Sequence, residues 1–235
     1  MNNTSLNSTP AGNPLTLALR RIVLVAPALV LAVALWWHPA GGTDVFAGVS
    51  PDAEAWITVH TAFLFATPLL GIAVYLLLHG MRGRAATVSR VALVFFLVFY
   101  TAYEVTVGVS TGVLVDYANA LPAGEQAAVA GAIQDLNRNA ILSDPSLSML
   151  LGSLGWIVAM CAAAVAAHRS GAGLPVTILL GTASIFVMHP PPVGPVGLAS
   201  FAAAAVLVER ARARAPVAVD DGARPATDRA PALVT

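Results

Sequence analysis

VALVFFLVFYTAYEVTVGVSTGVLV, residues 91–115, is the stretch that decides the fold. It is apolar almost throughout, and roughly 20 such residues cross the hydrocarbon core of a bilayer as a helix. One carboxylate, Glu104, lies in its middle. An ionisable group at that depth is costly unless it faces protein or water. The stretch therefore predicts a membrane-spanning helix that carries a candidate functional residue.

The composition of the whole chain agrees with a protein that crosses the membrane several times. Of 235 residues, 57% are hydrophobic and 10% are charged, with a mean hydropathy of +0.78, whereas a soluble domain has about 25% charged residues. The net charge is zero and no basic patch is present, so we expect no nucleic-acid partner. Every basic residue is arginine, and together with abundant Ala, Gly and Val this suggests a GC-rich bacterial genome.

We predict an all-α bundle of six transmembrane helices within residues 15–209. Arg20 and Arg21 precede the first apolar run as in a signal peptide, but the run ends in Trp36 and Trp37 without a small-residue cleavage site, so we expect it to be retained. The last two runs are short for spans, and prolines separate them. They form either two short spans, which we favour, or a re-entrant hairpin. The expected helices cover residues 18–37, 56–78, 91–115, 147–167, 174–188 and 193–208.

The segments outside the bundle are polar. The tails 1–14 and 210–235 are too poor in large apolar residues to order themselves, and we expect both to be disordered. Between the third and fourth spans, Val129, Ile133, Leu136 and Ala140 recur at helical spacing. Residues 122–141 therefore predict an amphipathic helix on the membrane surface, which would cover whatever opens on that side.

Arginine placement predicts the orientation. In a six-helix topology one side carries all the arginines of residues 1–214 except Arg138, namely Arg20, Arg21, Arg82, Arg84, Arg90, Arg169, Arg210, Arg212 and Arg214. The positive-inside rule then makes both termini cytoplasmic in a plasma (inner) membrane. Most of the acidic residues face outward.

Small residues mark the packed faces, because helices associate in lipid through small and polar side chains. Gly108 and Gly112 lie on the same predicted face as Glu104, and Gly152 and Gly155 belong to a small-residue stripe on the fourth span. Each glycine pair forms a seam at which a second copy of the chain (a homo-oligomer) or a partner helix could also pack. The lipid bilayer is the other expected partner.

The candidate site combines this topology with the few chemically capable side chains. His38, His60, Glu104 and His189 converge on the outer half of the predicted bundle. Glu104 and His60 form the candidate proton-handling pair, and His38, His60 and His189 are candidate metal ligands. The residues expected to line the site are Tyr100, Tyr103, Asp44 and Trp56. No HExxH or CxxC motif supports a particular metal.

Four functions fit this pattern. The first is an outward-facing site that binds or translocates a small ligand, a proton or a metal ion. The second is a membrane-embedded metal enzyme with Glu104 as acid and base. The third is a haem protein, because His60 and His189 outside and His79 and His168 inside resemble the arrangement of cytochrome b561 proteins, a resemblance that implies b-type haem and electron transfer. The fourth is an accessory or scaffold subunit.

Overall fold

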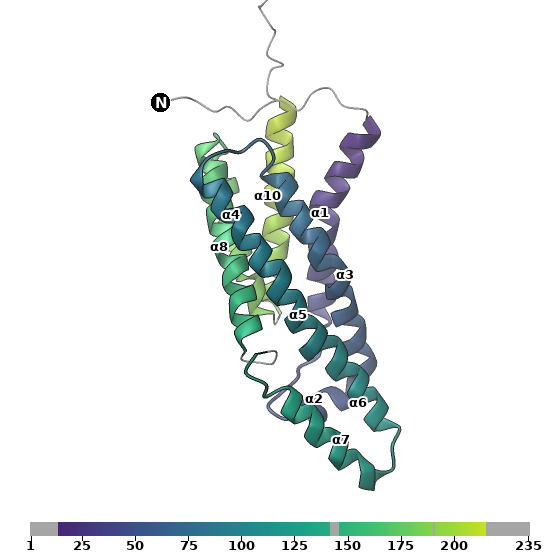
Figure 1. Ribbon diagram of the computed structural model, residues 1–235. Helices are drawn as coiled ribbons and strands as arrows, with labels where there is room; N and C mark the ends of the chain where they lie inside the picture. Colours follow the sequence, from purple (N-terminus) through teal and green to yellow (C-terminus); the bar gives the residue numbers. More distant parts are fainter. Residues whose placement is uncertain (1–13, 142–145, 190, 215–235) are drawn as a thin grey trace, which may run out of the picture.

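Long apolar helices make up the fold. A computed structural model describes residues 14–141, 146–189 and 191–214, so the predicted tails lie almost wholly outside the described residues. Within these ranges the secondary structure is entirely helical, and five helices are long and apolar enough to cross a membrane (Figure 1). They are α1 (Pro14–Trp36), α3 (Ala53–Leu77), a continuous helix over Arg84–Asn119, α8 (Leu147–Arg169) and α10 (Val193–Arg214). By length and composition, the chain is a multi-span membrane protein.

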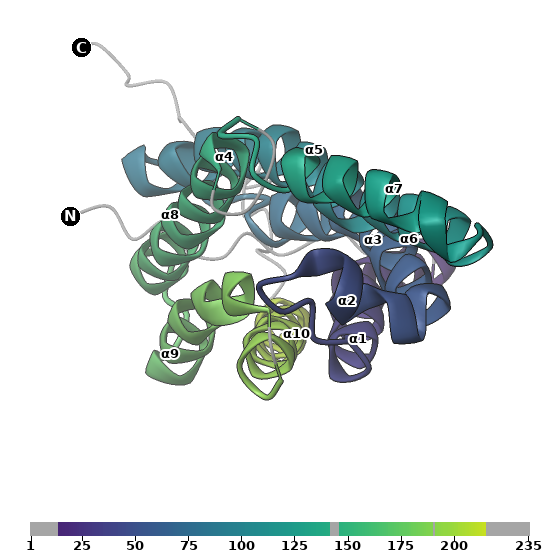
Figure 2. The ribbon, with the colours of Figure 1, turned by 90° about the horizontal axis from the view of Figure 1, so that it is seen from below.

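The helices form a closed ring when the bundle is seen along its axis (Figure 2). In order around the ring, α1 contacts α3, α3 contacts the long helix Arg84–Asn119, and that helix contacts α8. Next come α9 (Leu174–Ala183) and α10, which closes the ring against α1. The start of α1 and the end of α10 lie at the same end of the bundle (Figure 1).

The fifth and sixth predicted spans differ from each other. α9 continues into the short helix η4 (Ser184–Met188), and this unit is shorter than the five candidate spans. The expectation that the last span is also short is wrong, because α10 has 22 residues and runs on to Arg214. It continues past residue 208 because Glu209 accepts hydrogen bonds from Arg20 and Arg212, so these charged residues are held within the helix.

The predicted third span is longer and less regular than its sequence indicates. It consists of α4 (Arg84–Phe95), the π-helix η2 (Phe96–Tyr100), α5 (Thr101–Tyr103), the π-helix η3 (Glu104–Ser110) and α6 (Thr111–Asn119). A π-turn holds one more residue than an α-turn, so it changes the direction in which the following side chains point, and such turns are frequent at functional sites. Glu104 begins the second π-segment.

Three short helices cover the other end of the bundle: α2 (Val45–Val49), η1 (Ser50–Asp52) and α7 (Ala123–Leu136). α7 confirms a helix in the segment predicted to be amphipathic. Ile133, on its predicted apolar face, is fully buried in a small cluster with Trp56 and Val115. This cluster holds α7 against α3 and α6 (Figure 2).

The glycine seams are filled by the chain itself. A Cβ on Gly108 would overlap the ring of His60, and one on Gly112 would lie 2.8 Å from Trp56. On α8, a Cβ on Gly155 would lie 2.6 Å from the backbone nitrogen of Phe96, and Gly152 is equally close to the long helix. These glycines let the chain's own helices approach, so both seams serve packing within the chain, and a homo-oligomer or partner-helix contact stays a prediction.

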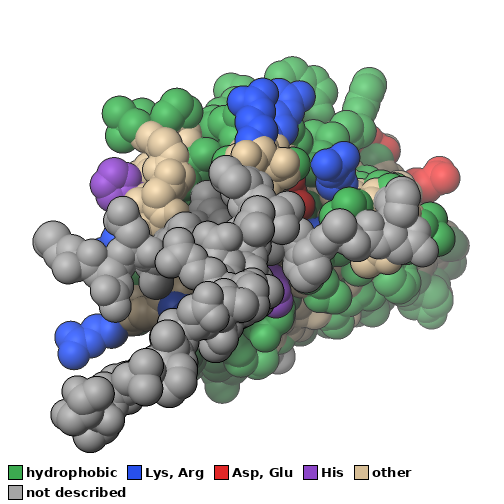
Figure 3. Space-filling view, turned by 90° about the horizontal axis from the view of Figure 1, so that it is seen from above, with side chains coloured by type: hydrophobic (Ala, Val, Ile, Leu, Met, Phe, Trp, Pro, Cys, Tyr) green, Lys and Arg blue, Asp and Glu red, His purple; other side chains and the backbone are tan. Residues whose placement is uncertain are grey.

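Arginines close the end of the bundle where α1 begins. Arg20, Arg90 and Arg212 donate to backbone carbonyls at the C-terminal end of α3, including Leu76 O and Leu77 O. Carbonyls in the last turn of a helix have few backbone partners, and the guanidinium groups supply hydrogen bonds there in addition to turn contacts such as His79 N–H to Leu76 O. Figure 3 looks onto this end, where further arginine side chains are exposed.

Candidate functional site

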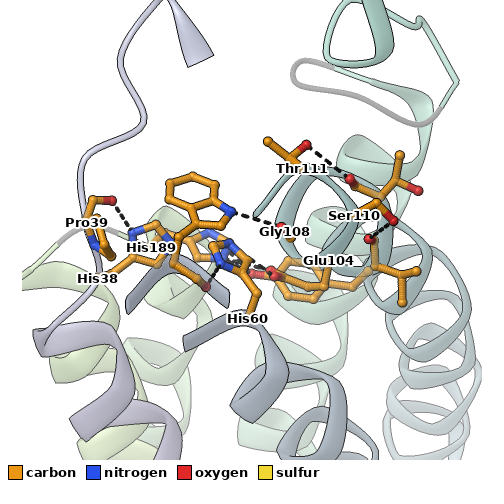
Figure 4. A network of polar contacts seen from close by, with 12 residues as sticks. His38, Pro39, His60, Glu104, Gly108, Ser110, Thr111 and His189 are labelled. Atoms are coloured by element: carbon orange, nitrogen blue, oxygen red, sulfur yellow. Dashed lines mark hydrogen bonds and ion pairs between the residues drawn. The ribbon is translucent and has the colours of Figure 1, made fainter. Parts of the chain in front are cut away.

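Glu104 is the centre of a buried polar cluster (Figure 4). Its side chain is 1% exposed. Oε1 lies 3.0 Å from Nε2 of His189, and Oε2 lies 3.9 Å from Nε2 of His60. Oε2 is buried and has no hydrogen-bond partner in the described part of the chain. One carboxylate therefore stands between two imidazoles with half of its hydrogen-bonding capacity unused.

His60 is fixed by its own helix and by a glycine opposite. Its Nδ1–H donates to Trp56 O at 2.8 Å, and the Trp56 ring stacks on the imidazole. Trp56 Nε1–H in turn donates to Gly108 O at 2.9 Å. Gly108 has no side chain, so the imidazole can lie directly against η3. With Nδ1 protonated, Nε2 is the acceptor nitrogen and faces Glu104.

His189 reaches Glu104 from the tip of the α9–η4 unit. Its Nε2 lies 2.8 Å from the Tyr100 hydroxyl as well as 3.0 Å from Glu104 Oε1. The backbone of His189 has φ of +24°, a region that side chains other than glycine enter at a cost of about 1–3 kcal/mol. The two polar contacts of the ring compensate for this strain. Non-glycine residues with such backbones are concentrated at functional sites.

His38 lies next to this cluster, just after α1. Its ring centroid is 4.9 Å from that of His60 and 6.1 Å from that of His189. Nδ1–H donates to Pro39 O at 2.7 Å. Burial, and then the neighbouring His60 and His189, lower the pKa of His38 from 6.5 to about 4. His38 is therefore neutral at pH 7, with Nε2 as an acceptor.

A cavity of about 850 Å³ opens onto these imidazoles from the end covered by α2 and α7. It exists because the α9–η4 unit is short. His189, at the tip of that unit, meets Glu104, whereas the long helix continues from Glu104 to Asn119, about 22 Å further at 1.5 Å per residue. The lining includes His38, Trp56, His60, Tyr103 and His189.

An aromatic layer closes the cavity toward the arginine end. Phe63 follows His60 by one turn, Phe186 precedes His189 by one turn, and Phe96 precedes Tyr100 by one turn. These rings and that of Trp156 are fully buried, and Phe186 contacts both Phe63 and Trp156. The cluster is therefore accessible from one side only.

The structure brings together most of the predicted site residues. His38, His60, Glu104 and His189 converge, Trp56 and Tyr103 line the cavity, and Tyr100 lies fully buried beneath it, where it contacts His189. Asp44 is not brought to the cluster, because it is exposed and its carboxylate accepts from Ala47 N as the N-cap of α2.

Sequence reasoning missed the contribution of α7. Gln134, Asn137 and Arg138 line the cavity mouth. Two of these residues, Gln134 and Arg138, lie on the polar side of the predicted amphipathic helix, for which no site residue was predicted. The available signal was Arg138 itself, the one arginine in residues 1–214 that the predicted topology puts on the acidic side.

The geometry favours neither a metal nor a haem. Among the described residues, no group of three or more His, Cys, Asp or Glu side chains is arranged to hold a metal ion. His60 and His189 share a carboxylate rather than flanking a space for a porphyrin. His79 and His168, the inner pair of the haem hypothesis, are both exposed, so the residues do not fit the b561-type arrangement.

Comparison with known proteins gave no match to a family model, to a curated protein or to a solved structure. The site geometry therefore carries the functional argument.

Proposed function

We propose that this protein binds a small polar solute in the cavity and that binding is coupled to a proton held by the His60–Glu104–His189 cluster. The observation that carries the proposal is the Oε2 atom of Glu104, which is buried without a hydrogen-bond partner among the described residues, next to His60 and His189, which line a cavity of about 850 Å³. Ligand cavities usually measure about 300–1,000 Å³.

The proton follows from the electrostatics of burial. An ionised carboxylate away from water is strongly disfavoured unless it is paired. Among the described residues Glu104 has no arginine partner; the groups that face it are His60, His189 and Tyr100, with His38 and Tyr103 behind them. A single proton on the line between Oε1 and His189 Nε2 neutralises the site in either position. A solute that hydrogen-bonds to Glu104 or to His189 changes the affinity of the other residue for that proton.

The arginine distribution supports an orientation for this site. We propose that the arginine end is cytoplasmic and that the cavity opens outward from a plasma membrane. On this topology both chain termini are cytoplasmic. Because the aromatic layer is fully buried, the cavity in this orientation would be open to the outside only.

Histidine nitrogen NMR tests the coupling. In ¹⁵N-histidine-labelled protein, we expect the Nε2 resonances of His60 and His189 to titrate together in the wild type and independently in Glu104→Gln, which keeps the shape but not the charge. Thr177→Ala, on α9 and away from the cluster, is the matched control. Identical histidine titrations in wild type and Glu104→Gln would contradict the proposal and leave Glu104 as a structural tie between helices.

A further inference from the structure

We infer that the solute is a small monocarboxylate and that Arg138 pairs with its carboxylate group; this rests on the proposed function. Arg138 is the only residue with a permanent charge among those that line the cavity in the described structure. Six acidic residues are described at the same end of the bundle, and none of them lines the cavity: Asp44, Asp52, Glu54, Asp116, Glu125 and Asp135.

Hydrogen bonds on α7 hold Arg138 at the mouth. Gln134 accepts from Val45 N and donates to Thr43 O, at 3.4 and 3.3 Å. Asn137, which is buried, donates to Thr111 Oγ1 at 3.0 Å. These contacts tie the end of α7 to the loop on one side of the cavity and to α6 on the other. Arg138 follows Asn137 directly, so its backbone is held at the rim, and Arg138 is among the residues that line the cavity.

The guanidinium of Arg138 is uncommitted. It forms no ion pair and no side-chain hydrogen bond with a residue that the structure describes, in contrast to Arg20 and Arg212, which bind both Glu209 and backbone carbonyls. A guanidinium presents paired N–H groups whose geometry matches a carboxylate. A guanidinium on the wall of a cavity whose described lining includes no carboxylate is therefore suited to an anionic ligand.

The remainder of the lining limits the ligand further. One guanidinium balances one negative charge, and a dianion would leave excess negative charge near Glu104. Apolar side chains line much of the cavity between the mouth and the cluster, among them Val107, Met149, Val187 and Met188. A ligand with a single carboxylate on a short apolar body, aliphatic or aromatic, balances the charge of Arg138 and matches the apolar lining of the cavity.

Two matched pairs of probes test this inference: benzoate against benzamide and acetate against acetamide, with affinities measured by calorimetry on the full-length detergent-purified protein. We expect the wild type to bind benzoate at least tenfold more tightly than benzamide. Arg138→Gln should remove that preference and leave benzamide unchanged, and Arg138→Lys should restore only part of it, because lysine keeps the charge without the paired donors. Arg21→Gln, an exposed arginine at the opposite end, should bind as the wild type does.

Equal binding of benzoate and benzamide, unchanged benzoate binding by Arg138→Gln, or binding of neither carboxylate would overturn the inference. Arg138 is exposed, so Arg138→Gln is expected to fold, and an unchanged unfolding temperature verifies this. Failure of the proposed function is a separate result, because it would appear as histidine titrations that Glu104→Gln does not alter, whatever the probes do.

Discussion

In their neutral forms, the imidazoles of His38 and His60 each have a tautomer set by a backbone carbonyl. His38 donates Nδ1–H to Pro39 O and His60 donates Nδ1–H to Trp56 O. Nε2 is therefore the acceptor in both rings. Since each carbonyl is within a few residues of its histidine, these tautomers depend on local backbone geometry and not on the distant parts of the bundle.

The lowered pKa of His38 predicts a loss of stability in weak acid. Between pH 6.5 and about 4 the unfolded chain binds a proton at His38 that the folded chain does not, so the free energy of unfolding decreases as the pH falls through that range. We expect a loss of about 1–2 kcal/mol after allowance for the partial exposure of the ring.

Thermal unfolding in detergent between pH 4 and 7 measures this effect. His38→Gln should flatten the decline of the unfolding temperature below pH 6.5, whereas His79→Gln, at an exposed position at the other end, should not. Parallel curves for the wild type and His38→Gln would show that His38 is protonated in the folded state as readily as in the unfolded chain.

Residue chemistry explains what could be predicted about the site. Glu104 was identifiable because a carboxylate in the middle of an apolar span has to be accommodated. The approach of His189 to Glu104 could not be predicted, because it depends on a backbone with φ of +24° that no local sequence pattern indicates. The exclusion of Asp44 depends on the short helix α2 that it caps, inside a segment expected to be a loop.

At the scale of the elements, the two π-segments decide which side chains meet. Tyr100 ends η2 and Glu104 begins η3, and both are buried at the same cluster. Side-chain to backbone hydrogen bonds span five residues in η3, from Ser110 to Val105 O and from Thr111 to Thr106 O. A regular 3.6-residue period predicted the right face of this helix, but the period cannot reveal the extra residue in each turn.

The contact between α8 and the long helix predicts a position-specific intolerance to a methyl group. Gly155→Ala would put a Cβ 2.6 Å from Phe96 N and 2.8 Å from Ala92 O. Because both atoms belong to the backbone, the helices must separate. We expect Gly155→Ala to cost about 1–3 kcal/mol, as overpacking typically does.

Gly181→Ala, on α9, is the control, because its Cβ would meet nothing within 4 Å. Alanine is favoured over glycine in a helix by about 1 kcal/mol, so this variant should be as stable as the wild type or more so. Unfolding temperatures in detergent compare the two. A Gly155→Ala protein as stable as Gly181→Ala would show that α4 and α8 pack less closely than described.

The whole molecule is closed at one end by arginines and open at the other beneath α7. Arg84 begins the long helix Arg84–Asn119, which is a candidate span, and Gly124 follows it, so we expect the two positions to lie on opposite sides of a membrane. In a Cys161→Ala background, an impermeant maleimide added to intact cells should label Gly124→Cys and not Arg84→Cys. Both positions are exposed, so access does not limit labelling.

The reverse labelling would invert the proposed orientation, and labelling of both positions from outside would contradict a span between them. Detergent-permeabilised cells, in which both variants should react, serve as the control for reactivity.

Global properties were predictable to different degrees. Hydropathy and length located the helices, because bilayer thickness imposes them on the sequence. The extension of α10 to Arg214 was not predictable, since it depends on Glu209 binding Arg20 from the other end of the chain. The cavity arises from the difference in length between the α9–η4 unit and the helix beside it. It could not be predicted, because the sequence does not indicate that these two elements lie side by side.

The shortness of the α9–η4 unit also has an electrical consequence. In a bilayer, the aqueous cavity beyond its tip brings the outer solution partway across the insulating layer, so a charge bound near His189 lies within the transmembrane field. Moving one elementary charge through the whole field involves about 2.3 kcal/mol per 100 mV, and binding at half depth would involve about half of that. The proton proposed for the His60–Glu104–His189 cluster would therefore respond to the resting voltage of the cell, with hyperpolarisation favouring the protonated state.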